Sequence, residues 1–407
     1  MQPLVVFSHL RWDFVYQRPQ QLMARLAKDY RVFFVEEPVH HSGPAYMEIT
    51  TPVMGVHVCR PHTSVVAPGF HDDQLPLLEE LLEDLLVDHD LRNPIVWLYT
   101  PMALPLVQHL RPCALVYDCM DELSAFLHAP RQLMQREHAL LKVADVVFTG
   151  GRSLYRAKKP RHDAVYCFPS SVESTHFAQA KDPAIEPAEQ RSLSRPRLGF
   201  YGVIDERLDL DLIGLVARQH PQWQIVMVGP VVKIDPLGLP RYPNIHYFGQ
   251  RPYAELPGFV AGWDVCLMPF ALNRSTQFIS PTKTLEYMAA GKAIVSTRIP
   301  DVLELYGDVV YSGTNDMAFV VACERALQMS SEASDRAAHM REMVAATSWD
   351  ATAAAMHSIL QTFVAPAPAL LKQPAIEAIA VPELDRSRSN AAGMGGAPAS
   401  QGQIVSN

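Results

Sequence analysis

The segment SPTKTLEYMAAG, residues 280–291, is the part of the chain from which the fold can be argued most directly. Ser280 is a good helix cap, and Pro281 suits the first helical position because its missing N–H has no partner there anyway. Gly291 can end the helix in a left-handed conformation. The segment therefore predicts a short helix over residues 281–290.

Two charged residues lie on one face of this expected helix. Lys283 stands in the first turn, where free N–H groups and the helix dipole already make the potential positive, so the position favours a bound anion. Glu286 follows about 4.5 Å further along the axis, where a carboxylate suits the two hydroxyls of a ribose. The pair indicates a nucleotide site. The window alone leaves open a surface helix that packs through Leu285 and Met288 and carries a solvated ion pair.

The flanking sequence favours the nucleotide site. WDVCLMPF (263–270) is typical of a buried strand, a polar loop follows, and 293–297 is expected to be the next strand. Here the chain resembles the donor-nucleotide site of the GT-B glycosyltransferases, most closely the large retaining family that includes bacterial polysaccharide and lipid glycosyltransferases. That family has two glutamates separated by seven residues. Glu286 matches the second, and Phe278 stands where the first would fall, so the match covers the nucleotide half of the motif.

The composition sets the broad class. With 407 residues, 48% of them hydrophobic and 19% charged, the chain is long enough for two domains with cores of their own. A net charge of −8 argues against a nucleic-acid-binding protein. The six cysteines show no metal-ligand spacing and are expected to be reduced. Without a leader-like start or a run of ~18 apolar residues, we expect a cytoplasmic protein.

The N-terminal region begins as a βαβ unit, with strands expected at 4–8 and 32–35 and a helix at 18–29. The loop HLRWDFVYQRPQ, residues 9–20, follows the carboxyl end of the first strand, where open α/β sheets bind ligands. It resembles a signature of a bacterial subgroup of the same family, close to W-D-F-x-x-Q-R-P-Q. The candidates for acceptor or donor contacts are Arg11, Trp12 and Arg18. The alternative is a loop whose aromatic side chains only plug the end of the domain.

Further strands are expected at 95–100, 114–119, 146–149 and 164–168. Asp118 and Asp121 follow the carboxyl end of the second of these, so they are expected to reach the same cleft as the loop 9–20. We assign both to acceptor binding and Asp121 also to catalysis. The alternative for either is a helix cap.

A run of cationic residues follows the strand at 146–149. It holds Arg152, Arg156, Lys158, Lys159 and Arg161. On a helix beside the cleft, such a run can contact the inner face of the membrane or a phosphorylated lipid acceptor. The alternative is a solvated helix face.

The second half opens with strand 197–202 and a glycine turn. Gly202 stands where the resembled family has a glycine under the donor phosphates, and Arg207 falls near its phosphate-binding lysine. The family's arginine after the glycine is Val203 here. The resemblance therefore implies donor-nucleotide contacts from Gly202, Arg207, Ser280, Lys283, Thr284 and Glu286, with catalytic roles for Arg207 and Lys283 beside Asp121. The base is expected against the backbone near 229–233 and 248–251.

The resulting fold class is α/β: a GT-B arrangement of two Rossmann-like domains that face each other across a cleft, with a C-terminal crossover helix and a disordered tail. The expected divisions are an acceptor-side domain at 1–180, a linker at 181–196, a donor-nucleotide domain at 197–346, the crossover helix at 347–364 and the tail at 365–407. Removal of the tail is expected to leave fold and activity unchanged.

The function that this resemblance implies is transfer of a sugar from a nucleotide sugar, such as a UDP- or GDP-sugar, to a hydroxyl of a saccharide or lipid-linked saccharide. No metal and no resident cofactor are expected, since cationic side chains and helix dipoles would stabilise the leaving diphosphate. The anomeric configuration of the donor would be retained. Two alternatives stay open: a GT-B scaffold that binds nucleotide without turnover, and a GT-B sugar-nucleotide epimerase.

Overall fold

The first of two sheets is built from apolar, mostly parallel strands. The computed structural model describes residues 1–127, 129–328 and 335–364. The strand order is β3-β5-β2-β1-β6-β7-β8-β9, and β4 pairs antiparallel with β5 at one edge. The strands are β1 (Gln2–Ser8), β2 (Tyr30–Glu36), β3 (Val39–His40), β4 (Tyr46–Val53), β5 (Val56–Thr63), β6 (Ile95–Leu98), β7 (Ala114–Cys119), β8 (Val146–Thr149) and β9 (Val165–Cys167).

Both faces of this sheet are buried. Val5 and Phe7 of β1 belong to one apolar cluster, whereas Leu4 and Val6 belong to another on the opposite face. Burial on both sides explains why these strands are continuous apolar runs. The covering helices are α1 (Arg18–Leu26), α2 (Leu75–Asp88), α3 (Val107–Leu110), α4 (Gln132–Val143) and α5 (Arg152–Lys158).

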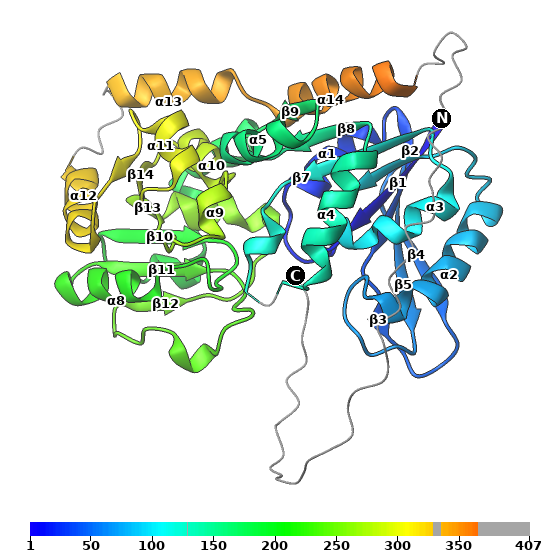
Figure 1. Ribbon diagram of the computed structural model, residues 1–407. Coiled ribbons are helices and arrows are strands. Elements are labelled where there is room, and N and C mark those ends of the chain that lie inside the picture. The colour runs from blue at the N-terminus through cyan, green and yellow to red at the C-terminus, as the bar shows by residue number, and fades with distance from the viewer. Residues whose placement is uncertain (128, 329–334, 365–407) are drawn as a thin grey trace.

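The second sheet is entirely parallel, in the order β12-β11-β10-β13-β14-β15. Its strands are β10 (Arg197–Tyr201), β11 (Gln224–Val228), β12 (Ile245–Tyr247), β13 (Val265–Met268), β14 (Ala293–Ser296) and β15 (Tyr311–Ser312). The accompanying helices are α8 (Leu210–Gln219), α9 (Leu256–Ala261), α10 (Lys283–Ala289), α11 (Pro300–Tyr306), α12 (Asp316–Gln328) and α13 (Asp335–Ala345). Each sheet with its helices forms one half of the molecule, and the two halves lie side by side (Figure 1). The predicted α/β fold class is confirmed.

The helix expected at 281–290 is shorter at its start. It begins at Lys283, Thr282 occupies the cap position without a side-chain cap bond, and Ser280 is therefore not the cap. The backbone carbonyl of Ser280 instead accepts a hydrogen bond of 2.9 Å from the Ser170 hydroxyl of the first half. The expected end is correct, because Gly291 has a left-handed φ of 72°.

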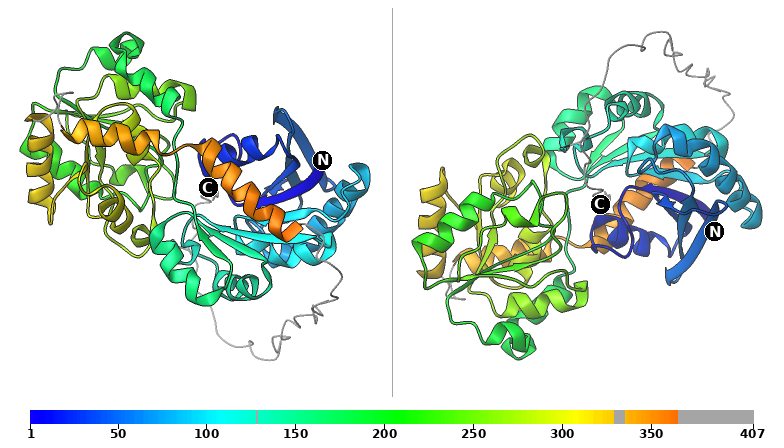
Figure 2. Two further views of the ribbon diagram at one scale, coloured as in Figure 1. Left: turned by 90° about the horizontal axis from the view of Figure 1, so that it is seen from above. Right: turned by 90° about the horizontal axis from the view of Figure 1, so that it is seen from below.

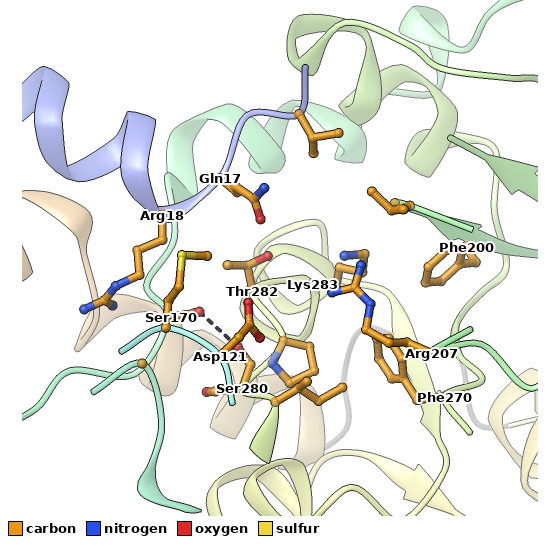
Figure 3. A pocket seen from close by; sticks show the side chains of 17 residues that line it. Gln17, Arg18, Asp121, Ser170, Phe200, Arg207, Phe270, Ser280, Thr282 and Lys283 are labelled. Carbon is orange, nitrogen blue, oxygen red and sulfur yellow. Dashed lines mark hydrogen bonds between the residues drawn. The ribbon is translucent and has the colours of Figure 1, made fainter. Parts of the chain in front are cut away.

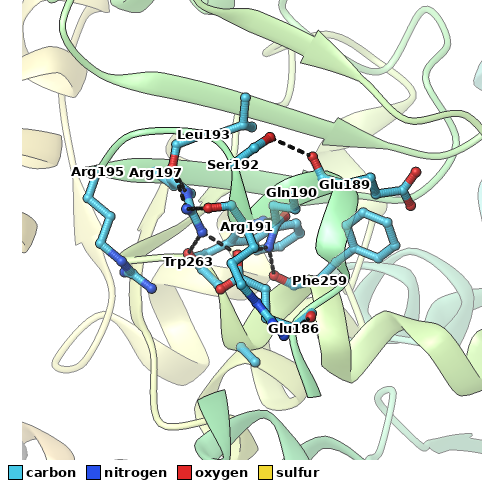
Figure 4. A network of polar contacts seen from close by, with 12 residues as sticks. Glu186, Glu189, Gln190, Arg191, Ser192, Leu193, Arg195, Arg197, Phe259 and Trp263 are labelled. Atoms are coloured by element: carbon cyan, nitrogen blue, oxygen red, sulfur yellow. Dashed lines mark hydrogen bonds and ion pairs between the residues drawn. The ribbon is translucent and has the colours of Figure 1, made fainter. Parts of the chain in front are cut away.

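The segment 181–196, expected to be a linker, packs closely against the second sheet. It contains α7 (Ala188–Arg191). The buried Arg197 guanidinium pairs with Glu186, whose carboxylate also accepts a bond of 3.1 Å from Gln190. The Gln190 side chain in turn accepts a bond of 2.8 Å from the indole N–H of Trp263 (Figure 4). These satisfied polar contacts fix the segment to the second core.

The chain passes from the first core to the second before this segment. Phe168 packs against the core of the first sheet, whereas Val172 already belongs to the second core. Helix α6 (Ser174–Ala178) contributes Phe177 to that second core. Residues 174–180 thus pack with the second half, although the sequence assigned them to the first.

The crossover helix returns to the first half. Helix α14 (Trp349–Val364) follows α13 and lies across the first sheet (Figures 1 and 2). Its buried residues, Trp349, Ala353, Met356 and Leu360, join the same apolar cluster as Leu4 and Val6 of β1. The predicted crossover helix is therefore present, and the predicted disordered tail at 365–407 lies outside the described residues. Within the described ranges, we find no helix with the length and apolarity that crossing a bilayer requires.

A second connection between the halves joins α5 to α11. The buried Asp301 carboxylate accepts a bond of 3.0 Å from the backbone N–H of Ser153. Glu304 pairs with Arg152 at 3.0 Å and with Arg156 at 2.8 Å. Together with α14, these contacts hold the carboxyl ends of the two sheets against each other.

We predict that Trp349→Ala lowers the free energy of unfolding by ~3–5 kcal/mol, because it leaves a large cavity in the first core. Trp349 is 1% exposed. Ser358→Ala, on the exposed face of α14, is the control and is expected to change stability by less than ~0.5 kcal/mol. Urea denaturation measures both, and equal small effects would show that α14 does not contribute to the first core.

Candidate functional site

Two adjoining cavities lie where the carboxyl ends of the two sheets meet. The larger has a volume of about 700 Å³ and the smaller about 130 Å³. Both are lined by residues from each half, and they share Val15, Gln17, Gly202, Thr282 and Lys283. The larger volume falls within the roughly 300–1,000 Å³ that is usual for small-molecule sites.

Lys283 lies at the junction of the two cavities. No hydrogen bond or ion pair engages its ammonium group among the residues that the structure describes, although Nζ lies 5.7 Å from the ring centre of Phe200 and 5.8 Å from that of Tyr201. A Cβ on Gly202 would lie 2.5 Å from Lys283 Cε, so any larger residue there would displace the end of the lysine side chain. Burial lowers the pKa of Lys283. The result is an unpaired cation directed at a cavity.

Glu286, one turn further along α10, lines the larger cavity. It is buried, and its carboxylate accepts a hydrogen bond from the Tyr201 hydroxyl. Burial raises the pKa of Glu286, whereas the nearby Lys283 lowers it. Because a carboxylate can accept about four hydrogen bonds, Glu286 retains capacity for a ligand. The arrangement differs from the solvated ion pair of the alternative interpretation.

Arg207 and Asp121 line the smaller cavity (Figure 3). Arg207 is bound by both oxygens of the buried Asp205, with its closest contact at 2.7 Å. Asp121 follows β7 and is the one carboxylate among the residues that line this cavity. Burial raises the pKa of Asp121 to about 6, an effect that Arg207 opposes and Asp205 reinforces. A carboxylate of this kind can accept a proton or a hydrogen bond near neutral pH.

Arg18 and Asp118 bind each other. The guanidinium donates to the Asp118 carboxylate at 2.9 Å, and the two side chains are 3% and 0% exposed. Arg18 also donates to the carbonyl of Phe168 at 2.8 Å, at the point where the chain leaves the first half. Arg18 borders the smaller cavity, but Asp118 lines neither cavity. These contacts give the pair a structural part in tying α1, β7 and the domain junction together.

Of the other candidate residues, some line a cavity and others lie outside both cavities. Trp12 lines the larger cavity together with Glu286 and Lys283, on the nucleotide side rather than with Asp121. Arg11 lines neither cavity and pairs with the buried Glu36 at 3.2 Å. Thr284 is also absent from both linings, because its hydroxyl points inward to Met268 Sδ at 3.5 Å.

Ser280 lines the smaller cavity, whereas Phe278 lines neither. Phe278 packs against the core of the first half instead. An apolar side chain is suited to this contact between the halves, and a glutamate would not be. Phe278, which stands where the resembled family has its first glutamate, is therefore not part of the site in this chain.

The cationic run at 152–161 is largely engaged within the protein. Arg152 and Arg156 pair with Glu304, as described above. Lys158 is 1% exposed and pairs with Glu122 at 2.7 Å and with Glu137. Arg161 also pairs with Glu137, at 2.9 Å.

Several lining residues were missed by the sequence analysis. They are Tyr201, Gln17 and Tyr253, together with the side chain of Gln250, of which only the backbone was expected near the base. Tyr201 and Gln250 directly flank the glycines at the ends of β10 and β12, and that position was an available signal. Among the described residues, we find no group of three or more His, Cys, Asp or Glu side chains arranged to hold a metal ion.

Comparison with known proteins connects this site to a family. Residues 195–330 match the model of the family described as glycosyl transferases group 1. TuaH of Bacillus subtilis (strain 168), which is named as a glycosyltransferase of teichuronic acid biosynthesis, is 26% identical over 296 residues, spanning 67% of this chain and 72% of that protein.

Solved structures share the fold. Sucrose-phosphate synthase from Thermosynechococcus elongatus superimposes with a TM-score of 0.66 at 17% identity, covering 89% of this chain and 99% of its own. A trehalose-6-phosphate protein from E. coli bound with UDP-2-fluoro glucose gives 0.66 at 14% identity, covering 88% and 99%. HepE from Anabaena in complex with UDP and glucose gives 0.62 at 13% identity, covering 89% and 100%.

We predict that Asp118→Ala lowers the free energy of unfolding by ~3–5 kcal/mol, because it leaves the Arg18 guanidinium buried without its partner. The control is Arg152→Ala, which breaks a pair whose arginine is 49% exposed and should cost no more than ~1 kcal/mol. Chemical denaturation compares the two. Similar small losses would contradict the structural part given to the Arg18–Asp118 pair.

We predict that Asp121→Asn raises the melting temperature at pH 7.5 relative to the native chain. Burial raises the pKa of Asp121 from 3.8 to about 6, so the folded state holds this proton more tightly than the unfolded state. That contribution to stability is complete below pH 4 and is lost as the pH rises through 6. The difference between variant and native protein should therefore grow from pH 4 to 7 and then level off. Melting curves that stay parallel over this range would contradict the assignment.

Proposed function

We propose that this chain is a group 1 glycosyltransferase with the GT-B fold and that it moves a sugar from a nucleoside-diphosphate sugar to a hydroxyl of a saccharide or lipid-linked saccharide. The product would be part of a cell-surface polysaccharide or glycolipid. The observation that carries the proposal is the unpaired Lys283 ammonium at the start of α10, with Glu286 one turn away on the same 700 Å³ cavity.

The donor diphosphate lies against Lys283 and Gly202 in this proposal, and Glu286 accepts hydrogen bonds from the ribose hydroxyls. A phosphate at Lys283 supplies the anion that a desolvated cation needs, because charge-assisted contacts are strongest where water is excluded. The backbone at Gly202 has a φ of 137° and no side chain, so a phosphate can approach it closely.

The donor sugar and the acceptor hydroxyl meet at the smaller cavity. As the bond from the sugar to the diphosphate breaks, Lys283 and Arg207 stabilise the negative charge that develops on the leaving group. Asp121, on the opposite side (Figure 3), accepts a hydrogen bond from the attacking hydroxyl and positions it. Transfer proceeds with retention of the anomeric configuration, as the family resemblance implies.

The relatives guide the choice of substrates to test. HepE is described in complex with UDP and glucose, and the E. coli protein is bound with UDP-2-fluoro glucose. TuaH is named for teichuronic acid biosynthesis. We therefore propose UDP-sugars as the first donors and a surface polysaccharide as the first acceptor class to test. Metal-independent turnover, with no resident cofactor, is part of the proposal.

A lipid-linked acceptor would bring the enzyme to the inner face of the membrane. Because Arg152, Arg156 and Lys158 are engaged in ion pairs, the cationic run gives this version little support. Sedimentation with vesicles that contain anionic lipid tests it directly. Co-sedimentation that 0.5 M salt abolishes would support peripheral contact.

A second function is a scaffold that binds a nucleotide without turnover. It is favoured by Phe278, which replaces the family's first glutamate and packs against the first half. Release of UDP from a panel of UDP-sugars, with and without acceptor, separates the two functions. Tight nucleotide binding without release of UDP under any of these conditions would favour the scaffold.

We predict that Lys283→Ala weakens binding of a nucleoside diphosphate by ~1.5–3 kcal/mol, which is about 10- to 150-fold in Kd, because a charge-assisted contact is lost. Titration calorimetry measures it, with UDP and GDP as probes. Lys28→Ala removes a lysine that is 72% exposed and far along the chain from α10, and it should leave the Kd unchanged. An unchanged Kd for Lys283→Ala would overturn the placement of the diphosphate.

A further inference from the structure

The first half contributes a wall to the larger cavity through residues 12–17. Buried polar side chains hold this loop in place. The buried Gln20 amide donates hydrogen bonds of 3.0 Å to the carbonyls of Trp12 and Val15. The buried Glu36 carboxylate accepts a bond of 2.7 Å from the backbone N–H of Trp12. A loop fixed at both ends by buried polar side chains is a pre-formed surface rather than a mobile cover.

The same loop contacts the second half across the larger cavity. The Gln250 side chain donates a hydrogen bond to the carbonyl of Phe14. The ring of Tyr16 packs against that of Tyr253, with ring centres 4.7 Å apart and planes inclined by 32°. The Tyr253 hydroxyl is itself fixed by a bond of 3.0 Å to Glu173. The wall therefore stands over the strand ends of the second sheet.

The strand ends of the second sheet form the floor of the larger cavity beneath this loop, and this floor extends away from Lys283. Strands β10, β11 and β12 are neighbours, so the end of β12 lies two strand spacings, about 10 Å, from the end of β10. Gly229, at the end of β11, packs so closely on Gly202 that a Cβ there would lie 1.9 Å from the Gly202 carbonyl oxygen. A nucleotide with its diphosphate at Lys283 and its ribose at Glu286 would place its base over this floor, facing the loop.

Of the three aromatic residues in this loop, Phe14 is the one without a ring partner in the described part of the chain. Trp12 packs edge-on against Phe34 in the core, and Tyr16 already packs against Tyr253. The Phe14 ring makes no ring–ring contact with any residue in the described part of the chain, is partly exposed, and lines the larger cavity. Stacking on a flat apolar ring is how proteins commonly hold a base without reading its edge.

We propose that the base of the bound nucleotide stacks on Phe14 of the first half, so that the donor pocket is completed from across the cleft. This inference rests on the proposed function, which supplies the nucleotide. It implies that nucleotide binding alone draws on both halves, because the diphosphate is held by α10 and the base by the loop that follows β1.

The test compares ligands with and without a base. Titration calorimetry with UDP, GDP and inorganic pyrophosphate is carried out on the native chain, Phe14→Ala and Phe14→Tyr. Phe14→Ala should weaken the tighter-binding nucleoside diphosphate by about tenfold, toward the low end of what one base–aromatic stack contributes. Phe14→Tyr, which keeps the ring, should restore the affinity. Binding of pyrophosphate should be the same in all three proteins.

The matched control is Tyr46→Ala, which removes a ring that is 45% exposed on β4 and absent from both cavity linings. It should bind every probe as the native chain does. Native affinity of Phe14→Ala for the nucleotides would overturn the stack, and so would an equal loss of nucleotide and pyrophosphate affinity. If the native chain binds pyrophosphate but neither nucleotide more tightly, the base contact is absent and the nucleotide assignment falls with it. Melting temperatures of each variant report whether the fold is kept.

Discussion

The Lys283 ammonium is a partly desolvated cation that forms no ion pair or hydrogen bond within the described chain, and the cleft is arranged around it. Gly202 provides its space, and Glu286 lies one turn away, bonded to Tyr201. Desolvation of a charge is unfavourable unless a partner of opposite sign is present. An enzyme that must bind and then release a diphosphate gains from leaving that partner to be supplied by the substrate, because a permanent ion pair would have to be broken at each turnover.

The two halves meet at this cation because several buried polar contacts fix the ends of the first sheet. Arg18 and Asp118 join α1 to β7 and to the carbonyl of Phe168 at the domain junction. Gln20 and Glu36 hold the loop that follows β1. The effect of these four residues on the site does not require that they contact the substrate. Each one fixes the position of a surface that lines the cavities.

The sequence predicted the parts that local patterns determine. Apolar runs located most strands of both sheets, and SPTKTLEYMAAG predicted the helix that carries Lys283 and Glu286. The β4–β5 hairpin and α2 were not anticipated, although the turn at Gly55, with a φ of 82°, was a usable signal. The start of α10 was misplaced because Ser280 interacts with Ser170 of the other half, a partner that local sequence does not reveal.

The sequence could not show which candidate residues line a cavity and which hold the lining segments in place. Arg18 comes after the loop that follows β1 and Asp118 lies near the end of β7, where ligand-binding residues are common, and only the structure shows that they bind each other. Similarly, Trp12 was a candidate for acceptor or donor contacts, and the structure shows that it lines the larger cavity with Glu286 because the loop reaches across to the second sheet. Long-range pairing of charged groups decides these roles, and it depends on which strands become neighbours.

A crystal structure of the full chain with a bound nucleoside diphosphate tests the account most directly. The account predicts phosphate oxygens within hydrogen-bond distance of Lys283 Nζ and both ribose hydroxyls on the Glu286 carboxylate. The base would lie between the ends of β11 and β12 and the loop that follows β1. A nucleotide bound elsewhere, with the Lys283 ammonium still unengaged, would contradict it.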